Sequence, residues 1–153
     1  MHTQPAFFRS NTVQYVLFLC VIAALLSLYF PIIRGMAADW SSNDNYSHGF
    51  FIPLITAFMV YTMKGELQKL PVRPNNWGIL LLLAGLGQLY VASVGSEFFL
   101  QRTSLILVLL GAVLYIWGTP VTRKTIVPVL YLLFMVPLPA IIWNKIAFPM
   151  QLF

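Results

Sequence analysis

Five long apolar runs constrain this chain more than any other feature of its sequence. They occupy residues 13–33, about 48–63, 77–94, about 104–118 and 126–143. Their lengths approach the roughly 20 helical residues that cross a hydrocarbon core about 30 Å thick. Helices are the natural assignment, because an open strand edge cannot exist in lipid and the alternation of a membrane barrel is missing. The sequence therefore predicts an all-α, polytopic membrane protein with about five transmembrane helices, forming one transmembrane domain over residues 1–153.

The composition excludes a soluble globule. Hydrophobic residues make up 59% of the 153 positions and charged residues only 8%, which leaves too little polar surface. The net charge is +5, and the nine lysine and arginine residues are scattered through short segments between the apolar runs. This distribution suits orientation in a membrane better than binding of nucleic acid. We therefore expect membrane lipid as a partner and no nucleic acid.

Metal and cofactor chemistry finds no support in the sequence. Cys20 is the single cysteine and lies inside the first apolar run, which excludes an internal disulfide and a cysteine-based metal cluster. No histidine or cysteine spacing for a metal and no glycine-rich phosphate loop occurs. We expect no cofactor and no metal site.

The basic residues between the runs predict the orientation. Six fall on one side, namely Arg9, Lys64, Lys69, Arg73, Arg123 and Lys124, and three on the other, namely Arg34, Arg102 and Lys145. The positive-inside rule then predicts a cytoplasmic N-terminus, with segments 34–47, 95–103 and 144–153 facing outward. A cleaved signal peptide, cut near Gly35, is the alternative for the first run, but the run is long for one and more spans follow.

The most polar segment, residues 39–49, belongs to the outward side. If the second span begins near Asp44 rather than His48, it reaches about 30 Å and places these two side chains one helical turn apart, where they can pair. An ionisable pair at this depth is a functional hypothesis. An ordinary connecting loop, with Asn43, Asp44 or Ser47 capping the helix, stays open as the alternative.

A second unusual outward segment covers residues 137–151. Pro137 and Pro139 remove backbone donors and are expected to break the fifth helix near its outer end, after which the chain would follow the interface. A plain helix end is the alternative. Within the spans, small and polar side chains are expected at helix contacts: Gly85, Gly87, Gln88 and Gly111.

Both outward segments resemble motifs of the exosortase family. Trp40 followed by residues 43–55 (NDNYSHGFFIPLI) looks like the family's first block. Residues 133–139 (LFMVPLP), with Trp143 and the later residues 149–152 (PMQL), look like its next block. The Tyr-Ser-His-Gly core is fairly specific where it opens a membrane span, and the proline block adds independent support.

The resemblance implies a multi-pass protein of the bacterial inner (plasma) membrane with about eight spans. It further implies a cysteine peptidase or transpeptidase with a periplasmic site. Such an enzyme would process exported proteins at a C-terminal sorting tail, made of a Pro-Glu-Pro motif, a hydrophobic span and a basic end, alongside exopolysaccharide production. The family chemistry is attributed to a cysteine nucleophile and arginines downstream of the proline block.

Neither the nucleophile nor the arginines can be carried over to this chain. Cys20 lies outside both blocks, so these groups are expected downstream of Phe153, and residues 1–153 are interpreted as an N-terminal part that is inactive alone. The candidate rim of the active site comprises Asp44, Tyr46, Ser47 and His48. Candidate structural supports are Trp40, Pro137, Pro139 and Trp143.

Two functions of other classes stay open. One is a non-catalytic membrane scaffold for export or assembly. The other is a transporter fragment in which Asp44, His48 and Gln88 line a polar path, although the spans hold almost no charge near the midplane, where transporters bind cargo. The sequence leaves the oligomeric state open.

Overall fold

A computed structural model describes residues 11–137 of the chain, and their regular structure is helical apart from one isolated bridge between Arg73 and Gly118. The α-helices are α1 (Asn11–Ser42), α2 (Phe51–Thr62), α3 (Lys64–Leu67), α4 (Trp77–Val94), α5 (Phe98–Ile116) and α6 (Thr119–Tyr131). Two 3₁₀ helices, η2 (Asp44–Phe50) and η3 (Leu132–Met135), precede α2 and follow α6. The predicted all-α class is confirmed.

Three of the described helices are long and apolar enough to cross a membrane: Ile22–Ser42 within α1, α4 and α5. This confirms a polytopic helical membrane protein. The second and fifth apolar runs instead give the shorter α-helices α2 and α6, of 12 and 13 residues, each continued by a 3₁₀ helix. α4 has the bounds 77–94 that the sequence predicted.

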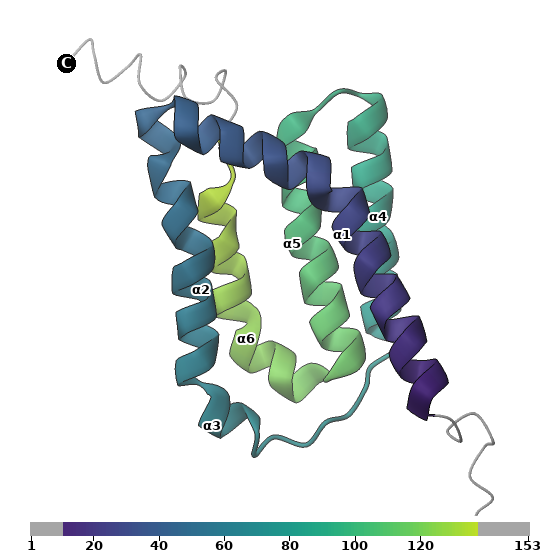
Figure 1. Ribbon diagram of the computed structural model, residues 1–153. Coiled ribbons are helices and arrows are strands. Elements are labelled where there is room, and N and C mark those ends of the chain that lie inside the picture. Colours follow the sequence, from purple (N-terminus) through teal and green to yellow (C-terminus); the bar gives the residue numbers. More distant parts are fainter. Residues whose placement is uncertain (1–10, 138–153) are drawn as a thin grey trace, which may run out of the picture.

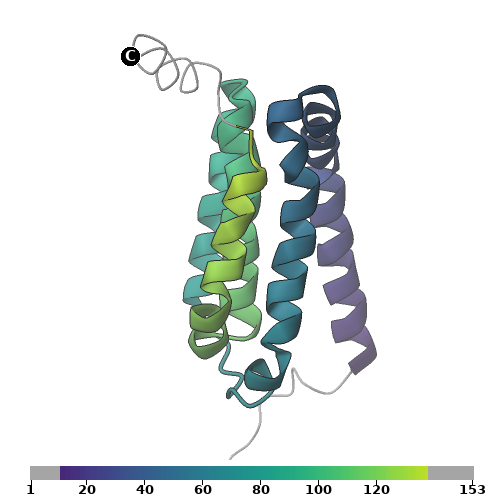
Figure 2. The ribbon, with the colours of Figure 1, turned by 90° about the vertical axis from the view of Figure 1, so that its left-hand side faces the viewer.

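The helices form two layers. Figures 1 and 2 show α1 and α2 in one layer and α4, α5 and α6 in the other. α1 bends near its middle, and its C-terminal part lies across the ends of the other helices toward the start of α2 (Figure 1). Pro31 lies inside α1 and lacks the backbone donor for the preceding turn, which accounts for the bend.

The outward segment predicted at 34–47 is helical for most of its length, because α1 continues to Ser42. The reason is tertiary. Tyr29, Met36 and Trp40 recur at spacings that place them on one helical face, and all three are buried, with 2%, 1% and 7% of their surface exposed. Burial of this face against the other layer extends the helix through its polar end.

The fourth and fifth runs also begin earlier than hydropathy predicts. α5 begins at Phe98 and thus includes Arg102, and α6 begins at Thr119 with Pro120 in its first turn, a favoured position for proline. After η3, Val136 is extended (φ −82°, ψ 117°), as a residue before proline prefers. The predicted break at Pro137 is confirmed, while Pro139 and Trp143 lie outside the described residues.

Glycines bring α4 and α5 into close contact. A Cβ at Gly85 would lie 2.7 Å from Cγ2 of Val108, and one at Gly111 would lie 2.7 Å from the backbone nitrogen of Leu82. These two glycines therefore serve as the predicted close-packing positions. The prediction for Gly87 is wrong, because a Cβ there meets nothing within 4 Å.

The turn between α5 and α6 is tied to the segment that precedes α4. Arg73 donates its backbone N–H to the carbonyl of Trp117 at 3.3 Å, and Asn75 Nδ2 donates to Thr119 Oγ1 at 3.0 Å. Gly118 has φ 82°, and a Cβ there would collide with the Arg73 carbonyl, so both its conformation and its surroundings require glycine. We call this end of the bundle the basic end, because α3, the segment after it and the start of α6 carry Lys64, Lys69, Arg73, Arg123 and Lys124.

Candidate functional site

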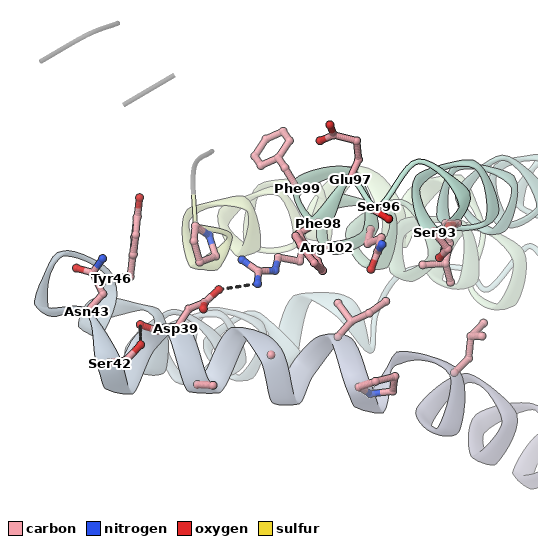
Figure 3. Close-up of a pocket in the computed structure, with 18 of the residues that line it drawn as sticks. Asp39, Ser42, Asn43, Tyr46, Ser93, Ser96, Glu97, Phe98, Phe99 and Arg102 are labelled. Carbon is pink, nitrogen blue, oxygen red and sulfur yellow. Dashed lines mark hydrogen bonds and ion pairs between the residues drawn. The ribbon is translucent and has the colours of Figure 1, made fainter. Parts of the chain in front are cut away.

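A pocket of about 980 Å³ opens at the end of the bundle opposite the basic end. Its walls come from the C-terminal part of α1, from η2, from the α4–α5 turn with the start of α5, and from Pro137. Figure 3 shows polar side chains converging on it from both layers. The pocket is therefore lined by residues of the predicted outward segments 34–47 and 95–103 and by Pro137, the first residue of the unusual segment 137–151, while the predicted outward segment 144–153 lies outside the described residues.

An ion pair crosses the pocket. Arg102, in the second turn of α5, donates from Nη2 to Oδ2 of Asp39, near the end of α1, at 2.5 Å. The Arg102 side chain is 12% exposed and the Asp39 side chain 44% exposed, so the guanidinium is the more deeply placed partner. These residues lie 63 positions apart, and their contact fixes the end of α1 against α5.

The α4–α5 turn forms the polar wall facing η2. The backbone N–H of Glu97 donates to the Ala92 carbonyl at 2.9 Å, and that of Ser96 donates to the Ser93 carbonyl at 3.3 Å. These two hydrogen bonds together define a Schellman motif at the end of a helix. Ser96 takes the left-handed position of this motif, φ 55°, where glycine is usual. Ser93, Ser96 and Glu97 thereby line the pocket (Figure 3).

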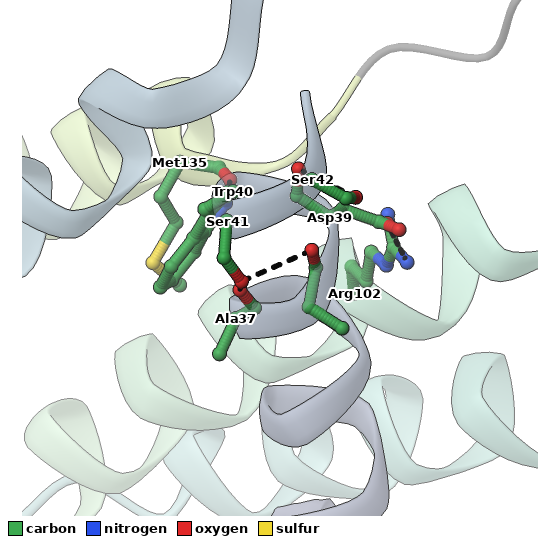
Figure 4. Close-up of polar contacts among 8 residues, drawn as sticks. Ala37, Asp39, Trp40, Ser41, Ser42, Arg102 and Met135 are labelled. Carbon is green, nitrogen blue, oxygen red and sulfur yellow. Dashed lines mark hydrogen bonds and ion pairs between the residues drawn. The ribbon is translucent and has the colours of Figure 1, made fainter. Parts of the chain in front are cut away.

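Trp40 joins the two family-like blocks beside the pocket. Its indole Nε1–H donates to the Met135 carbonyl at 2.9 Å, across 95 positions of sequence (Figure 4). The Phe50 ring packs edge-on against the indole at a centroid distance of 5.1 Å. A Cβ at Gly49 would overlap the indole ring, so only glycine permits this approach. The arrangement places the chain before Pro137 next to η2.

The four predicted rim residues have different surroundings. Tyr46 is half-buried and lines the pocket, whereas Asp44, Ser47 and His48 are exposed side chains of η2. Ser47 Oγ donates to the Asp44 carbonyl at 2.9 Å. Asn43 Oδ1 accepts the backbone N–H of Asn45 at 3.1 Å, so the capping that was the alternative interpretation does occur at Asn43.

The predicted pairing of Asp44 with His48 is wrong: these two side chains form no ion pair in the described part of the chain. Helical structure does begin at Asp44, but as a 3₁₀ helix. With about three residues per turn, positions four apart are rotated by about 120° instead of facing the same side. The expected spacing for a pair applies only to an α-helix.

The ion pair that crosses the pocket was not predicted from the sequence. Asp39 lay inside the polar segment and Arg102 was predicted on the same side of the membrane, so opposite charges on one face were the available signal. The predicted helix contact of Gln88 is confirmed, because its Nε2 donates to Thr103 Oγ1 at 2.8 Å and to the Leu100 carbonyl at 3.0 Å. Cys20 is exposed on α1 and is not among the lining residues.

Metal-ligating side chains do not cluster within residues 11–137: no group of three or more histidine, cysteine, aspartate or glutamate residues there could hold an ion. The chemistry that the described pocket offers is hydrogen bonding and ion pairing. Its donors and acceptors are a guanidinium, two carboxylates, a phenol, hydroxyls and amides.

Together, the helices and the pocket define a multi-pass helical membrane protein with a polar site at one end of its bundle. The family model for transmembrane exosortases matches residues 40–153, which is most of the chain and includes both blocks that Trp40 joins. The chain belongs to the transmembrane exosortase family, a family of cysteine transpeptidases. No curated protein and no solved structure matches it.

Proposed function

We propose that this chain is the N-terminal part of a longer exosortase-type cysteine peptidase or transpeptidase, and that the pocket beside Asp39 and Arg102 belongs to its active site. One observation carries the proposal. The two blocks of the family match meet through the bond from Trp40 to the Met135 carbonyl, and this junction adjoins the pocket. Asn43, Asn45 and Tyr46 of the first block and Pro137 of the second block all line the pocket.

The nucleophile comes from another part of the longer protein in this proposal. A thiolate that attacks a peptide carbonyl needs a lowered thiol pKa and donors for the oxyanion. Cys20 is exposed on α1 outside the pocket, so it does not meet this need. The cysteine and its assisting arginines would follow Phe153, and Asp44, Ser47 and His48 would form the outer rim above Tyr46.

We further propose five crossings within residues 1–153 and a cytoplasmic N-terminus in the bacterial inner membrane. Besides the three long helices, one crossing is formed by η2 together with α2, and another by α6 together with η3. Figure 2 shows α2 and α6 running alongside α4 and α5. Basic residues gather at the end opposite the pocket: Lys64, Lys69, Arg73, Arg123 and Lys124. The positive-inside rule then directs the pocket to the periplasm.

The proposed substrates are exported proteins with a C-terminal sorting tail that carries a Pro-Glu-Pro motif, in cells that produce exopolysaccharide. The transporter alternative loses support, because the Gln88 amide is engaged with α5 and Asp44 and His48 are exposed on η2. A non-catalytic scaffold is the outcome that the experiment below must separate from the enzyme.

The test begins with the intact mass of the protein extracted from its native membrane. A mass well above 17.3 kDa is expected. Cleavage of a reporter protein that carries the sorting tail is then compared for three samples: the complete protein, the complete protein with Cys20→Ser, and residues 1–153 alone. We expect cleavage by the complete protein and by Cys20→Ser, and none by residues 1–153. A native mass of 17.3 kDa would favour the scaffold. Cleavage that depends on Cys20 would overturn the proposed location of the nucleophile.

A further inference from the structure

Arg102 has more hydrogen-bonding capacity than the described structure uses. A guanidinium carries five N–H donors in a planar fork. Among the described residues, Arg102 donates from one nitrogen to one oxygen, Asp39 Oδ2. With the side chain only 12% exposed, few of the unused donors can be satisfied by bulk water, and unpaired polar groups of a charged side chain are costly to bury.

The unused donors face the pocket. Within the described residues, Thr56 Oγ1 is the one side-chain nitrogen or oxygen atom that is buried without a partner, so the nitrogens of Arg102 that do not bond to Asp39 keep some exposed surface. Arg102 is itself a wall residue of the cavity of about 980 Å³ (Figure 3). Gly35, opposite, has no side chain to fill the approach, and a Cβ there would stand 4.0 Å from Nη2.

The present partner leaves room for another. Asp39 makes a one-point contact and is 44% exposed, whereas a carboxylate can accept two parallel bonds from a guanidinium. Glu97 also lines the pocket, so the wall carries two carboxylates and one guanidinium. This charge balance disfavours a phosphate, with its larger negative charge, and tolerates a single carboxylate attached to apolar contacts. Phe98, Phe99 and Pro137 supply such contacts in the wall.

We propose that Arg102 binds the carboxylate of an acidic side chain in the peptide substrate and sets the enzyme's preference for it, with Asp39 as an internal competitor. The proposal rests on the proposed function for the source of the carboxylate, a sorting tail. In the free protein Asp39 holds the guanidinium in the pocket. The incoming carboxylate accepts hydrogen bonds from the guanidinium N–H groups in place of Asp39. Asp39, the more exposed partner, then turns toward water.

The test measures binding of two tail peptides to the complete protein in detergent. The peptides differ only in a glutamate replaced by glutamine. The wild type should bind the acidic peptide at least about tenfold more tightly, as a charge-assisted pair predicts. Arg102→Gln should bring the ratio of the two Kd values to about one, and Arg102→Lys, which keeps the charge but not the fork, should give an intermediate ratio. Asp39→Asn should raise the ratio.

An arginine outside the pocket provides the control for the peptide-binding test. Arg34→Gln changes an exposed arginine of α1 outside the pocket and should leave the ratio unchanged. Equal binding of both peptides by the wild type overturns this inference alone, and binding of neither overturns the proposed function with it. If the ion pair is merely structural, Asp39→Asn and Arg102→Gln will weaken both peptides alike. If Arg102→Gln instead releases anionic lipid in native mass spectra without altering the ratio, the group bound is a lipid phosphate.

Discussion

The α4–α5 pair and the junction around Trp40 are assembled by different forces. In the pair, glycines let two neighbouring helices touch, and the contacts around Gly85 and Gly111 are made by backbone atoms and apolar side chains. At the junction, contacts are polar and long-range: the indole bond from Trp40 to Met135 spans 95 positions, and the ion pair of Arg102 with Asp39 spans 63.

The difference separates stability from function. In lipid, helices associate through close packing rather than through the hydrophobic effect, so a glycine contact between sequence neighbours is a local source of stability. The junction depends on partners from distant segments and leaves polar groups accessible in the pocket. Substitutions in the pair should therefore change folding most, and substitutions at the pocket end should change binding with smaller changes in folding.

The largest effect is expected from Gly111→Leu. A Cβ at this position would lie 2.7 Å from a backbone atom of Leu82, so the helices must separate. We expect a loss of about 3 kcal/mol, measured as a drop in Tm of the detergent-solubilised protein. Gly87→Leu is the matched control, since a Cβ there meets nothing within 4 Å, and it should change stability by about 0.5 kcal/mol or less. Equal drops in Tm would refute the packing argument.

A smaller effect is expected from Trp40→Phe. The ring still packs beside Gly49 and Phe50, but the Met135 carbonyl loses its donor in a buried place. We expect a loss of about 1–3 kcal/mol in the same thermal measurement. Trp77→Phe is the control, because Trp77 is 70% exposed. A junction held only by ring packing would show matching shifts for the two variants.

Ser96→Gly should stabilise the protein by about 1 kcal/mol. Ser96 occupies the left-handed position of the α4 helix end with φ 55°, which costs an L-residue energy that glycine does not incur. Ser93→Gly, inside α4, should instead lower Tm, because glycine weakens a helix interior. A fall in Tm for Ser96→Gly would contradict the strain argument at this wall of the pocket.

The smallest effect concerns the basic end. The hydrogen bond and charge of Lys124 lower the pKa of Glu66, with Nζ and Oε2 2.7 Å apart. Because the folded pKa lies below the unfolded one, the pair's stabilisation is fully present above the unfolded pKa and is lost as pH falls through the folded pKa. The Tm difference between wild type and Glu66→Gln should be slight at neutral pH, since both groups are exposed, and should vanish in acid. A difference that grows on acidification would reverse the assigned sign.

Much of the helical framework was predictable. Hydropathy located α4 to the residue and predicted the break at Pro137, because transfer to lipid and the geometry of proline are properties of a short segment. Helix ends that carry charge were missed: α5 begins before Arg102, and α1 continues past Asp39. A hydropathy window ends a span at a charged residue. In the folded protein the helices continue, because Asp39 and Arg102 neutralise each other in an ion pair.

By itself, the sequence determined that the chain is a helical membrane protein, and it contained both blocks of the exosortase family. Only the tertiary structure decided which polar residues meet. It paired Asp39 with Arg102, left Asp44 and His48 apart on a 3₁₀ helix, and placed the Met135 carbonyl at the Trp40 indole. The physical reason is that apolar periodicity acts along the chain, whereas ion pairs and indole bonds depend on how distant helices cross.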